Sequence, residues 1–600
     1  MTNQRRILAR FAQASLLTSL LILGLFFLLK PGRAAATAAP AAFCDTVTGI
    51  PLTECEALTA LYNSTDGPNW FDNFGWLTST APCDDWTGIL CSGGHVIVVS
   101  LGFNGLHGAL PAELGNLPYL VELDLSFNNL GGALPDQLWN LTELQNLYLG
   151  RSSSGGLTGT ITPTIGNLVD LQNLDLSSNR ISGTLPSTIG QLTSLRLFDL
   201  SSNLIQGAIP VSIGNLTNLR TLDLGHNQMT GALPTALGNL TLLEVLSLGI
   251  NQFVGDVPAE LSNLTHLHSL LLNSNQLTGT LPISLGNMSE LDTIEIFNND
   301  LTGAIPASIG NLPLLRTLSA TNNDLGGSLP PELGNLAALQ NLYLGSNHIS
   351  GSIPSQIGNL TALHNLALSA NRLEGALPPQ IGQLTQLQNL YLQANQLAAN
   401  IPATIVSLTQ LSRLDTGFNA LGAEAGALPF LASKDPQWAQ TQTVSPTNVQ
   451  LTQPLSTSAI MTWTPILYQG DGGFYEVSYG LLISGAYPMT ATTSDKTIGA
   501  LTVTDLTPGA AYCFRVRTFT PAHAAQQNAI WSAYTAPLCP GCGDFNGNGV
   551  IDLADIIAIS ERWLQTSSDP GWDGRFDLDG SGVIDMIDIM RVNANWDYHC

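Results

Sequence analysis

Apolar residues recur at a fixed spacing through the middle of this chain. The pattern LxxLxLxxNxLxGxIPxxLGNLxx repeats with its asparagine at positions 104, 128, 179, 203, 227, 251, 275, 299, 323, 347, 371, 395 and 419. Each interval is 24 residues, except that 51 residues separate Asn128 from Asn179 and hold one repeat lengthened by three residues. A period of this length predicts a solenoid, because one coil alone cannot bury its apolar face.

The positions within one repeat predict the shape of each coil. In the coil that ends at Asn179, the leucines Leu171, Leu174 and Leu176 have the spacing of inward-facing residues around a short strand. Asn179 follows at the strand-to-loop corner, where its amide can bond backbone groups and stack into a ladder with Asn203. Stacked coils then give a long parallel sheet on one side and irregular or short helical segments on the other.

The residue between the last two strand leucines faces the concave surface, because strand side chains alternate. This column reads Asp124, Tyr148, Asp175, Asp199, Asp223, Ser247, Leu271, Glu295, Ser319, Tyr343, Ala367, Tyr391 and Asp415. Successive members lie ~4.8 Å apart. The candidate ligand-binding residues are Phe103, Asp124, Phe127, Tyr148, Asp175, Asp199, Asp223 and Glu295. They suit a basic protein or a sugar held by carboxylates and aromatic faces; the alternative is that these are only common strand residues.

Residues 446–540 lose the 24-residue period and show alternating strand patterns instead, for example at 459–463, 475–479 and 512–518. Short alternating strands with Gly and Pro turns predict a β-sandwich.

Two segments near the C-terminus place oxygen-bearing residues at the spacing of calcium-binding loops. The expected ligands are Asp544, Asn546, Asn548, Val550, Asp552 and Asp555 in the first loop, and Asp577, Asp579, Ser581, Val583, Asp585 and Asp588 in the second. Val550 and Val583 offer carbonyl oxygens. Two calcium ions are therefore expected, and the second loop, with four carboxylates against three, is expected to fill first.

Eight cysteines fall into four local couples, each within or at the edge of one proposed module. The couples are Cys44 and Cys55, Cys83 and Cys91, Cys513 and Cys539, and Cys542 and Cys600. We expect four disulfides, typical of an oxidising compartment. Metal ligation or a catalytic thiol is the alternative, although no couple has CxxC spacing.

The charge of the chain and its N-terminal segment indicate where the protein is located and which partners are disfavoured. Residues 1–36 combine Arg5, Arg6 and Arg10 with an apolar run and small residues at 34–36, which predicts a secretion signal; an uncleaved membrane anchor is the alternative. Five of the 19 basic residues and none of the 44 acidic ones precede Ala36, so the remaining chain is strongly acidic. That charge disfavours nucleic acid and anionic membranes as partners. We expect a secreted, extracellular or cell-surface protein.

The repeat signatures LxGxIP and LGNL resemble plant-type leucine-rich repeats of receptor-kinase ectodomains and polygalacturonase-inhibiting proteins. The resemblance implies an N-terminal cap over 44–100, where residues 83–91 read CDDWTGILC, and repeats over 101–425, followed by a terminal cover and linker over 426–445. Trp463 and the segment 506–512 resemble a fibronectin-III sandwich with its buried Trp and tyrosine corner.

Each calcium loop is followed by an apolar helix, and this duplicated pattern over 541–600 resembles a dockerin. That resemblance implies calcium-dependent binding to a cohesin on a scaffold or cell surface, with Cys542 and Cys600 closing the module. Loop positions 10 and 11, which usually carry cohesin recognition, are Leu553, Ala554, Met586 and Ile587. They are apolar where many clostridial dockerins have hydroxyls, so the cohesin contact is expected to be more apolar.

The fold class expected is thus multidomain: a leucine-rich-repeat solenoid with a parallel sheet, a β-sandwich, and a small α-helical dockerin. The expected function is extracellular and non-catalytic, with the solenoid binding a protein or glycan and the dockerin binding a cohesin, linked by resemblance to polysaccharide-degrading assemblies. The alternative is an inhibitor or regulator of a polysaccharide hydrolase. No enzyme is expected, because the concave carboxylates have no positioned His or nucleophile.

Overall fold

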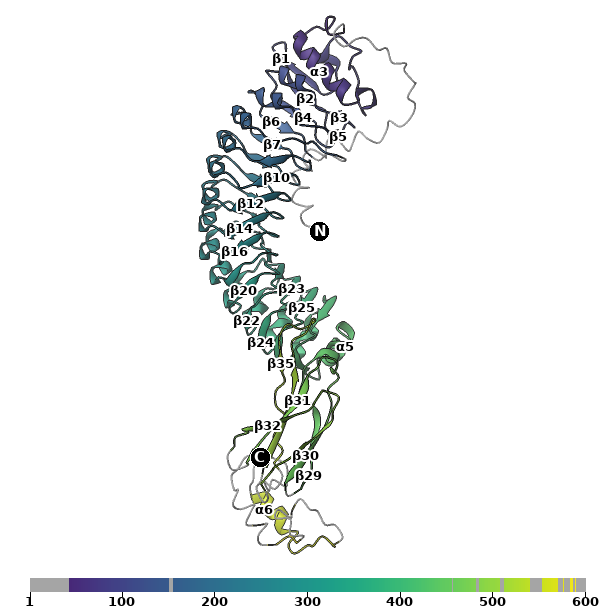
Figure 1. Ribbon diagram of the computed structural model, residues 1–600, viewed down its shortest axis with the longest axis vertical. Coiled ribbons are helices and arrows are strands. Elements are labelled where there is room, and N and C mark those ends of the chain that lie inside the picture. The colour runs from purple at the N-terminus through teal and green to yellow at the C-terminus, as the bar shows by residue number, and fades with distance from the viewer. Residues whose placement is uncertain are drawn as a thin grey trace.

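The structure, a computed structural model, describes residues 43–150, 155–455, 457–481, 485–507, 512–539, 553–569, 576, 583–585 and 589. A long curved solenoid is followed by a β-sandwich, and helix α6 lies at the far end of the sandwich (Figure 1). The predicted solenoid and sandwich are both confirmed.

The N-terminal cap closes the open apolar end of the solenoid. It contains α3 (Leu52–Ser64), η1 (Gly67–Asn69), α4 (Pro82–Asp85) and β1 (Ile89–Ser92), which pairs antiparallel with β2 (His95–Ser100). Trp70, Trp76 and Trp86 are buried against one another, and disulfides Cys44–Cys55 and Cys83–Cys91 link the cap segments.

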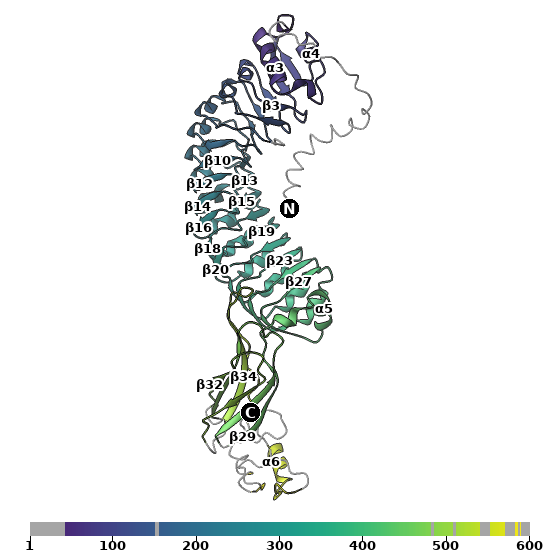
Figure 2. The same cartoon turned by 45° about the vertical axis from the view of Figure 1, so that its right-hand side comes forward.

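The solenoid is built on one 15-stranded sheet in which every pair after β1–β2 is parallel. After β2 the strands are β4 (Glu122–Asp124), β6 (Asn146–Tyr148), β7 (Asn173–Asp175), β9 (Leu197–Asp199), β11 (Thr221–Asp223), β13 (Val245–Ser247), β15 (Ser269–Leu271), β17 (Thr293–Glu295), β19 (Thr317–Ser319), β21 (Asn341–Tyr343), β23 (Asn365–Ala367), β25 (Asn389–Tyr391) and β27 (Arg413–Asp415). Figure 2 shows these strands along the inner curve of the solenoid.

Short 3-10 helices line the outer curve, as predicted for the helical side. They are η2 (Ala112–Asn116), η3 (Asp136–Asn140), η4 (Pro163–Asn167), η5 (Ser187–Gln191), η6 (Val211–Asn215), η7 (Thr235–Asn239), η8 (Ala259–Asn263), η9 (Ile283–Asn287), η10 (Ala307–Asn311), η11 (Pro331–Asn335), η12 (Ser355–Asn359), η13 (Pro379–Gln383) and η14 (Ala403–Ser407). Nearly all of them start directly after the proline of the repeat, whose fixed φ suits a helix start.

A second row of short strands, which the sequence pattern did not predict, lies between the asparagine corner and the 3-10 helices. These are β3 (His107–Ala109), β5 (Asn129–Gly131), β8 (Ser182–Thr184), β10 (Leu204–Gly207), β12 (Gln228–Ala232), β14 (Gln252–Asp256), β16 (Gln276–Thr278), β18 (Thr302–Ala304), β20 (Asp324–Gly326), β22 (Ser350–Gly351), β24 (Arg372–Gly375), β26 (Gln396–Ile401) and β28 (Ala420–Ala423). They pair in parallel only with their neighbours, so they form several small sheets.

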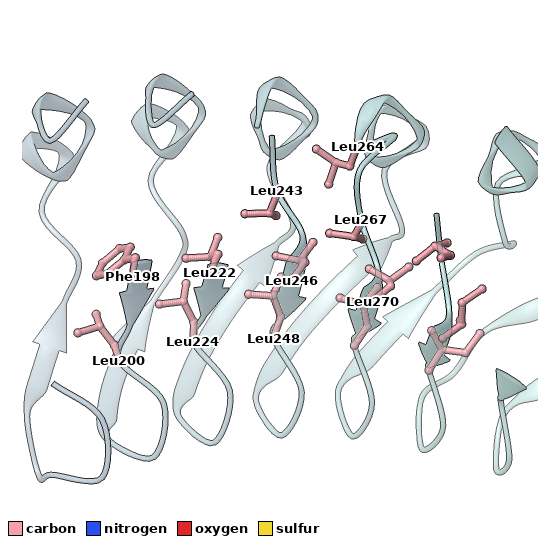
Figure 3. Close-up of a cluster of buried hydrophobic side chains, with 14 of the residues drawn as sticks. Phe198, Leu200, Leu222, Leu224, Leu243, Leu246, Leu248, Leu264, Leu267 and Leu270 are labelled. Atoms are coloured by element: carbon pink, nitrogen blue, oxygen red, sulfur yellow. The ribbon is translucent and has the colours of Figure 1, made fainter. Parts of the chain in front are cut away.

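The repeat leucines fill the space between the two sides of each coil. Leu222, Leu224, Leu246 and Leu248 are fully buried and stack from coil to coil (Figure 3). Because every coil contributes the same set, the core is one continuous apolar row that depends on both neighbours.

The predicted asparagine ladder supports the corner of each coil. The Nδ2 group of Asn203 donates to the carbonyls of Leu176 and Leu200 at 2.9 and 3.0 Å, and its Oδ1 accepts from the amide of Ile181 at 2.9 Å. The ladder therefore satisfies buried backbone groups that the turn leaves without a partner in the coil.

The segment 426–445 packs against the last coil. Helix α5 (Leu428–Lys434) buries Leu431, and η15 (Trp438–Thr441) follows it. Gln442 takes the place of the next ladder asparagine: its Oε1 accepts from the amide of Leu421 and its Nε2 donates to the carbonyl of Thr416. Together these residues cover the C-terminal end of the solenoid core.

The sandwich has two antiparallel sheets. One has the order β29 (Thr447–Leu455), β30 (Ser458–Thr464) and β33 (Ala500–Val503), and the other β32 (Met489–Thr492), β31 (Phe474–Leu481), β34 (Tyr512–Thr520) and β35 (Ile530–Trp531). Trp463 and Tyr475 are buried between them, and Cys513 is bonded to Cys539.

The sandwich is joined to the solenoid by side chains far apart in sequence. Gln526 donates to the carbonyls of Asn395 and Phe418, and Asn528 donates to the carbonyl of Asn371. Both side chains are buried. Buried amides that bond backbone carbonyls of three successive coils fix the sandwich on the solenoid.

Within the last module, α6 (Leu553–Ser560) buries Ile559 together with Phe576 and Ile584. These residues pack against Cys513 of the sandwich. No helix among the described residues is long and apolar enough to cross a membrane.

Candidate ligand-binding surface and docking module

The sheet register places the predicted concave column in one row. Asp124 pairs with Tyr148, Tyr148 with Asp175, Asp175 with Asp199, and Asp199 with Asp223. We call the four aspartates of this row the acidic column. Because the strands are parallel and in register, their side chains project from the same face at one-strand intervals.

Backbone amides at the strand ends hold these carboxylates. Asp175 Oδ1 accepts from the amide of Ser177, and Asp199 Oδ1 accepts from the amide of Ser201, each at 2.9 Å. Asp223 has the same contact with Gly225 at 2.9 Å. The repeated geometry fixes one oxygen of each carboxylate, so successive side chains are oriented alike.

Burial and then neighbouring charge raise the pKa values of two of these acids, Asp199 and Asp223. Burial, together with the charges of Asp223 and Asp175, raises the pKa of Asp199 to about 7. Burial also raises the pKa of Asp223. The pKa of Tyr148 is raised to about 12, first by burial and then by the neighbouring carboxylates. The acidic column therefore holds negative charges that repel one another, and a cationic ligand would relieve that repulsion.

Glu295 lies in the same row but not beside the acidic column. Ser247 and Leu271 separate it from Asp223, so it is three coils away. Burial raises the pKa of Glu295 as well. The structure thus brings Asp175, Asp199 and Asp223 together and leaves Glu295 apart.

The two predicted phenylalanines lie at the N-terminal end of this surface. The rings of Phe103 and Phe127 are stacked with centroids 4.0 Å apart. Phe71 and Phe74, in the cap, are also strongly exposed. Sequence reasoning missed these two because the cap has no repeat to mark them; the signal was two apolar residues within the otherwise polar segment 71–75.

A second polar row on the concave sheet also escaped prediction. Asn365 Nδ2 donates to Asn341 Oδ1 at 2.6 Å, and Asn389 Nδ2 donates to Asn365 Oδ1 at 2.5 Å. Tyr343 and Tyr391 lie on the same strands. The C-terminal half of the concave sheet is therefore lined by amides and tyrosines, in contrast to the acidic N-terminal half.

Most of the expected calcium ligands lie outside the described residues. These are Asp544, Asn546, Asn548, Val550, Asp552, Asp577, Asp579, Ser581 and Asp588, and the side chain of Asp555 is not described either. Asp585 and Val583 are described, and Val583 forms a bridge with Thr566. Carboxylate, amide, hydroxyl and carbonyl oxygens are the donors that calcium takes, so the residue types fit this ion. Within the described part of the chain no group of three His, Cys, Asp or Glu is placed to hold a metal.

Of the expected cohesin contacts, Leu553 and Ala554 are exposed at the start of α6, and Met586 and Ile587 lie outside the described residues. Ile557, one turn after Leu553, is exposed too, whereas Ile559 is fully buried. Helix α6 therefore presents one apolar face to the sandwich and another to solvent. Cys542 and Cys600 also lie outside the described residues.

Family models match three parts of the chain. A leucine-rich repeat region matches residues 155–304, with single leucine-rich repeats at 119–141, 314–336 and 338–360. A fibronectin type III domain matches residues 444–530, and a dockerin type I domain matches residues 542–595. All three resemblances seen in the sequence are thereby confirmed.

The solved structures that resemble this chain include a plant receptor and a bacterial leucine-rich-repeat protein. The plant peptide hormone receptor RGFR1 in complex with RGF2 is 32% identical with a TM-score of 0.54, over 56% of this chain and 57% of that one. The Leptospira interrogans protein LIC12759 is 32% identical with a TM-score of 0.41, over 56% of this chain and 88% of that one. The chain thus spans less than two thirds of the plant receptor's length. No curated protein matched.

Proposed function

The chain is a leucine-rich-repeat protein that also contains a fibronectin type III domain and a type I dockerin domain, and we propose that it is an extracellular docking protein. In this proposal the dockerin binds a cohesin on a scaffold or cell surface when calcium fills its loops, and the solenoid holds a protein or glycan ligand. The matched domains are non-catalytic binding modules. The single observation that carries the proposal is the dockerin match over 542–595, because that module serves only attachment.

Calcium has a defined role in this proposal. When bound, it cross-links the oxygen ligands of each loop and so orders the helix that follows. Ordering α6 fixes Leu553 and Ile557 on its solvent face, where an apolar cohesin surface can cover them. Because Leu553 and Ile557 are already about half buried, covering the rest of these two side chains contributes roughly 2–3 kcal/mol before the cost of association.

The packing of α6 against the sandwich supports a particular arrangement of the parts. The buried face of the helix rests on the Cys513–Cys539 region, and the sandwich is bonded to the last coils of the solenoid. A cohesin bound at the solvent face of α6 would therefore carry the concave sheet at a set distance from its scaffold. The sandwich acts as a spacer of fixed length.

The test is calcium titration of the full chain by calorimetry after removal of bound metal. Two binding events are expected, and the Asp577→Ala/Asp588→Ala variant should lose the tighter of them, since the second loop has more carboxylates. Glu561→Ala is the matched control, because Glu561 is an exposed carboxylate of the same module outside both loops. Absence of calcium binding in the unmodified chain would end the dockerin part of the proposal.

Cohesin binding is tested separately with a panel of recombinant cohesins. Binding that requires calcium and weakens in Leu553→Ser/Ile557→Ser would support docking through α6. Binding that persists in chelator, or none to any cohesin despite calcium binding, would contradict it.

Regulation of a polysaccharide hydrolase is the second candidate function. It draws on the resemblance of the repeats to polygalacturonase-inhibiting proteins and on a solenoid surface that carries half-buried aspartates and exposed aromatic groups. The discriminating measurement is the rate of hydrolysis of pectin, xylan and cellulose by purified hydrolases with and without the full chain. A stoichiometric fall in rate favours regulation; unchanged rates favour docking alone.

A further inference from the structure

Two arginines of strand β34 project from the outer face of the sandwich. Arg515 and Arg517 alternate with Phe514 and Val516, which are buried between the two sheets, so the arginine side chains leave the strand on the opposite side. The chain around them is acidic, with a formal net charge of −25. The carboxylates close to each arginine therefore decide whether its charge is free to bind a partner.

Arg517 has its carboxylate within the sandwich. Its Nε donates to Glu476 Oε1 at 2.8 Å, and its Nη2 lies 2.8 Å from the same oxygen. The hydroxyl of Tyr534 donates to that oxygen as well, at 2.7 Å. Arg517 is therefore neutralised and held by its own sheet, and we assign it a structural role.

Arg515, two residues earlier, is stacked in the same way but has no such carboxylate. Its guanidinium carbon lies 3.8 Å from the centroid of the Tyr534 ring and 4.2 Å from that of the Tyr487 ring. Among the residues that the structure describes, no Asp or Glu forms an ion pair with Arg515, and its buried Nε has no hydrogen-bond partner. We call Arg515 and the two tyrosines the arginine site. A guanidinium held against two rings loses little freedom on binding, and its planar fork matches a carboxylate.

The arginine site adjoins the proposed docking module. Tyr487 packs against the apolar cluster through which α6 rests on Cys513. Cys513 and Arg515 are two residues apart on β34 and so share one face of the sheet. The side of α6 that the sandwich leaves uncovered exposes Leu553 and Ile557, at 58% and 49%. A protein that covers this helix therefore also comes close to the outer face of the sandwich.

The rest of this sheet face has the composition of a protein interface. Beyond Arg517 the rings of Phe474 and Phe519 lie with centroids 4.9 Å apart, and Phe519 lies 4.5 Å from Trp531, which is exposed. Aromatic residues and arginine are enriched among the residues that contribute most to protein–protein binding. A partner that extends from α6 along the sheet would meet Arg515 before this aromatic group.

We propose that the arginine site binds a carboxylate of the same cohesin that covers the apolar face of α6, so that the sandwich forms part of the docking surface. The inference rests on the proposed function and goes beyond it, because there the sandwich is only a spacer. Arginine and a carboxylate form two parallel, charge-assisted hydrogen bonds. The remainder of the acidic chain repels an acidic side chain, so the position of Arg515 fixes the orientation of the partner.

The experiment measures the affinity of the full chain for a recombinant cohesin that binds in the calcium-dependent assay. Arg515→Gln should weaken binding at least about tenfold. The loss should be larger in about 0.05 M than in about 0.5 M salt, because the Debye length shrinks from about 14 to 4 Å over this range. Arg515→Lys keeps the charge without the planar fork, so it should recover only part of the affinity. Calcium titration should be unchanged in both variants, since the arginine site lies outside the calcium loops.

Arg413→Gln is the matched control. Arg413 is an exposed arginine of β27 on the solenoid, and its replacement changes the net charge of the chain by the same amount. This variant should bind the cohesin normally. In addition, the Asp and Glu residues of the cohesin are replaced one at a time by Asn and Gln. One of these changes should weaken binding to the unmodified chain and have no further effect on Arg515→Gln.

Each outcome decides for or against the arginine site. Equal affinity of Arg515→Gln and the unmodified chain, or an equal loss in Arg413→Gln, would overturn the inference and leave docking through α6 in place. Should Arg515→Gln fail to fold, a folded Arg515→Lys that binds as tightly as the unmodified chain would overturn it as well. Self-association that Arg515→Gln abolishes would assign this face to a second copy of the chain instead. If no cohesin binds in calcium, the docking proposal and this inference fall together.

Discussion

Replacing Asp199 with asparagine should stabilise the solenoid, although it changes a residue of the proposed binding surface. In the native row, burial and the charges of Asp223 and Asp175 raise the pKa of Asp199 to about 7, whereas an unfolded chain gives an aspartate a pKa of about 3.9. The asparagine side chain would keep an oxygen for the amide of Ser201 and would remove the repelled charge. The stabilisation is therefore electrostatic.

The sign of the pH dependence of stability follows from the number of protons that the folded and unfolded states bind. Below about pH 4 both states are protonated, and the residue contributes no pH dependence. Between about pH 4 and 7 the folded state binds more protons than the unfolded state, so stability is lost as pH rises, until both forms are ionised above about pH 7. A raised carboxylate pKa thus destabilises the solenoid at neutral and higher pH.

The pKa shift of Asp199 sets an upper limit on the stabilisation, and the surroundings of the side chain reduce it. About three pKa units correspond to roughly 4 kcal/mol at most. Sharing of the proton with Asp223 and contact with solvent reduce this, and we expect Asp199→Asn to gain about 1–2 kcal/mol at pH 8 and nearly nothing at pH 4. For a cooperative unit of about 400 residues that is about 1–2 °C in Tm.

The assay is thermal unfolding of the full chain by circular dichroism at pH 4, 5, 6, 7 and 8. Asp300→Asn is the matched control, because Asp300 is an exposed aspartate at the corner of a later coil. An equal gain at pH 4 and pH 8, a loss of stability, or the same profile in the control would refute the electrostatic reasoning.

Three further results are expected. Gln526→Ala/Asn528→Ala removes three hydrogen bonds from buried side chains to solenoid carbonyls, worth about 1 kcal/mol each. Calorimetry should then show the sandwich and the solenoid melting separately, whereas Gln527→Ala, a change at an exposed neighbour, should leave one shared transition. A shared transition in both variants would contradict a rigid joint. Gln442→Ala leaves the buried amide of Leu421 without a partner, while the carbonyl of Thr416 still accepts from Asn419, and it should cost about 1–3 kcal/mol in urea unfolding. The exposed Gln440→Ala should cost little. A calcium chelator should lower the melting temperature of the C-terminal module alone. An unchanged melting profile would argue against calcium-dependent folding.

The like charges of the acidic column affect both the stability of the solenoid and the kind of ligand that its surface favours. Surfaces shaped for a ligand commonly carry groups that destabilise the free protein, and a ligand of opposite charge restores that loss on binding. If the candidate surface binds a cationic ligand, that affinity and the pH dependence of stability should both respond to Asp199 and Asp223.

Much of the fold could be predicted from the sequence because equivalent positions occupy the same environment in every repeat. Thirteen ladder asparagines and their leucines fix the coil, its strand and its corner without any long-range information. The row from Asp124 to Asp415 followed from the alternation of strand side chains, and three of the four cysteine couples are the pairs that are bonded in the structure. The calcium loops could be recognised because their ligands are close in sequence.

Only the tertiary structure revealed the contacts that occur once and lie outside the repeat pattern. Gln442 acts as a ladder rung although it is a glutamine outside the repeat, and Gln526 and Asn528 reach carbonyls more than 100 residues away. The hydrogen bond from the amide of Phe71 to the carbonyl of Asn104 likewise depends on how the cap meets the first coil. Periodicity encodes contacts between equivalent positions, whereas a single contact between distant segments depends on the whole packed chain and leaves no pattern in the sequence.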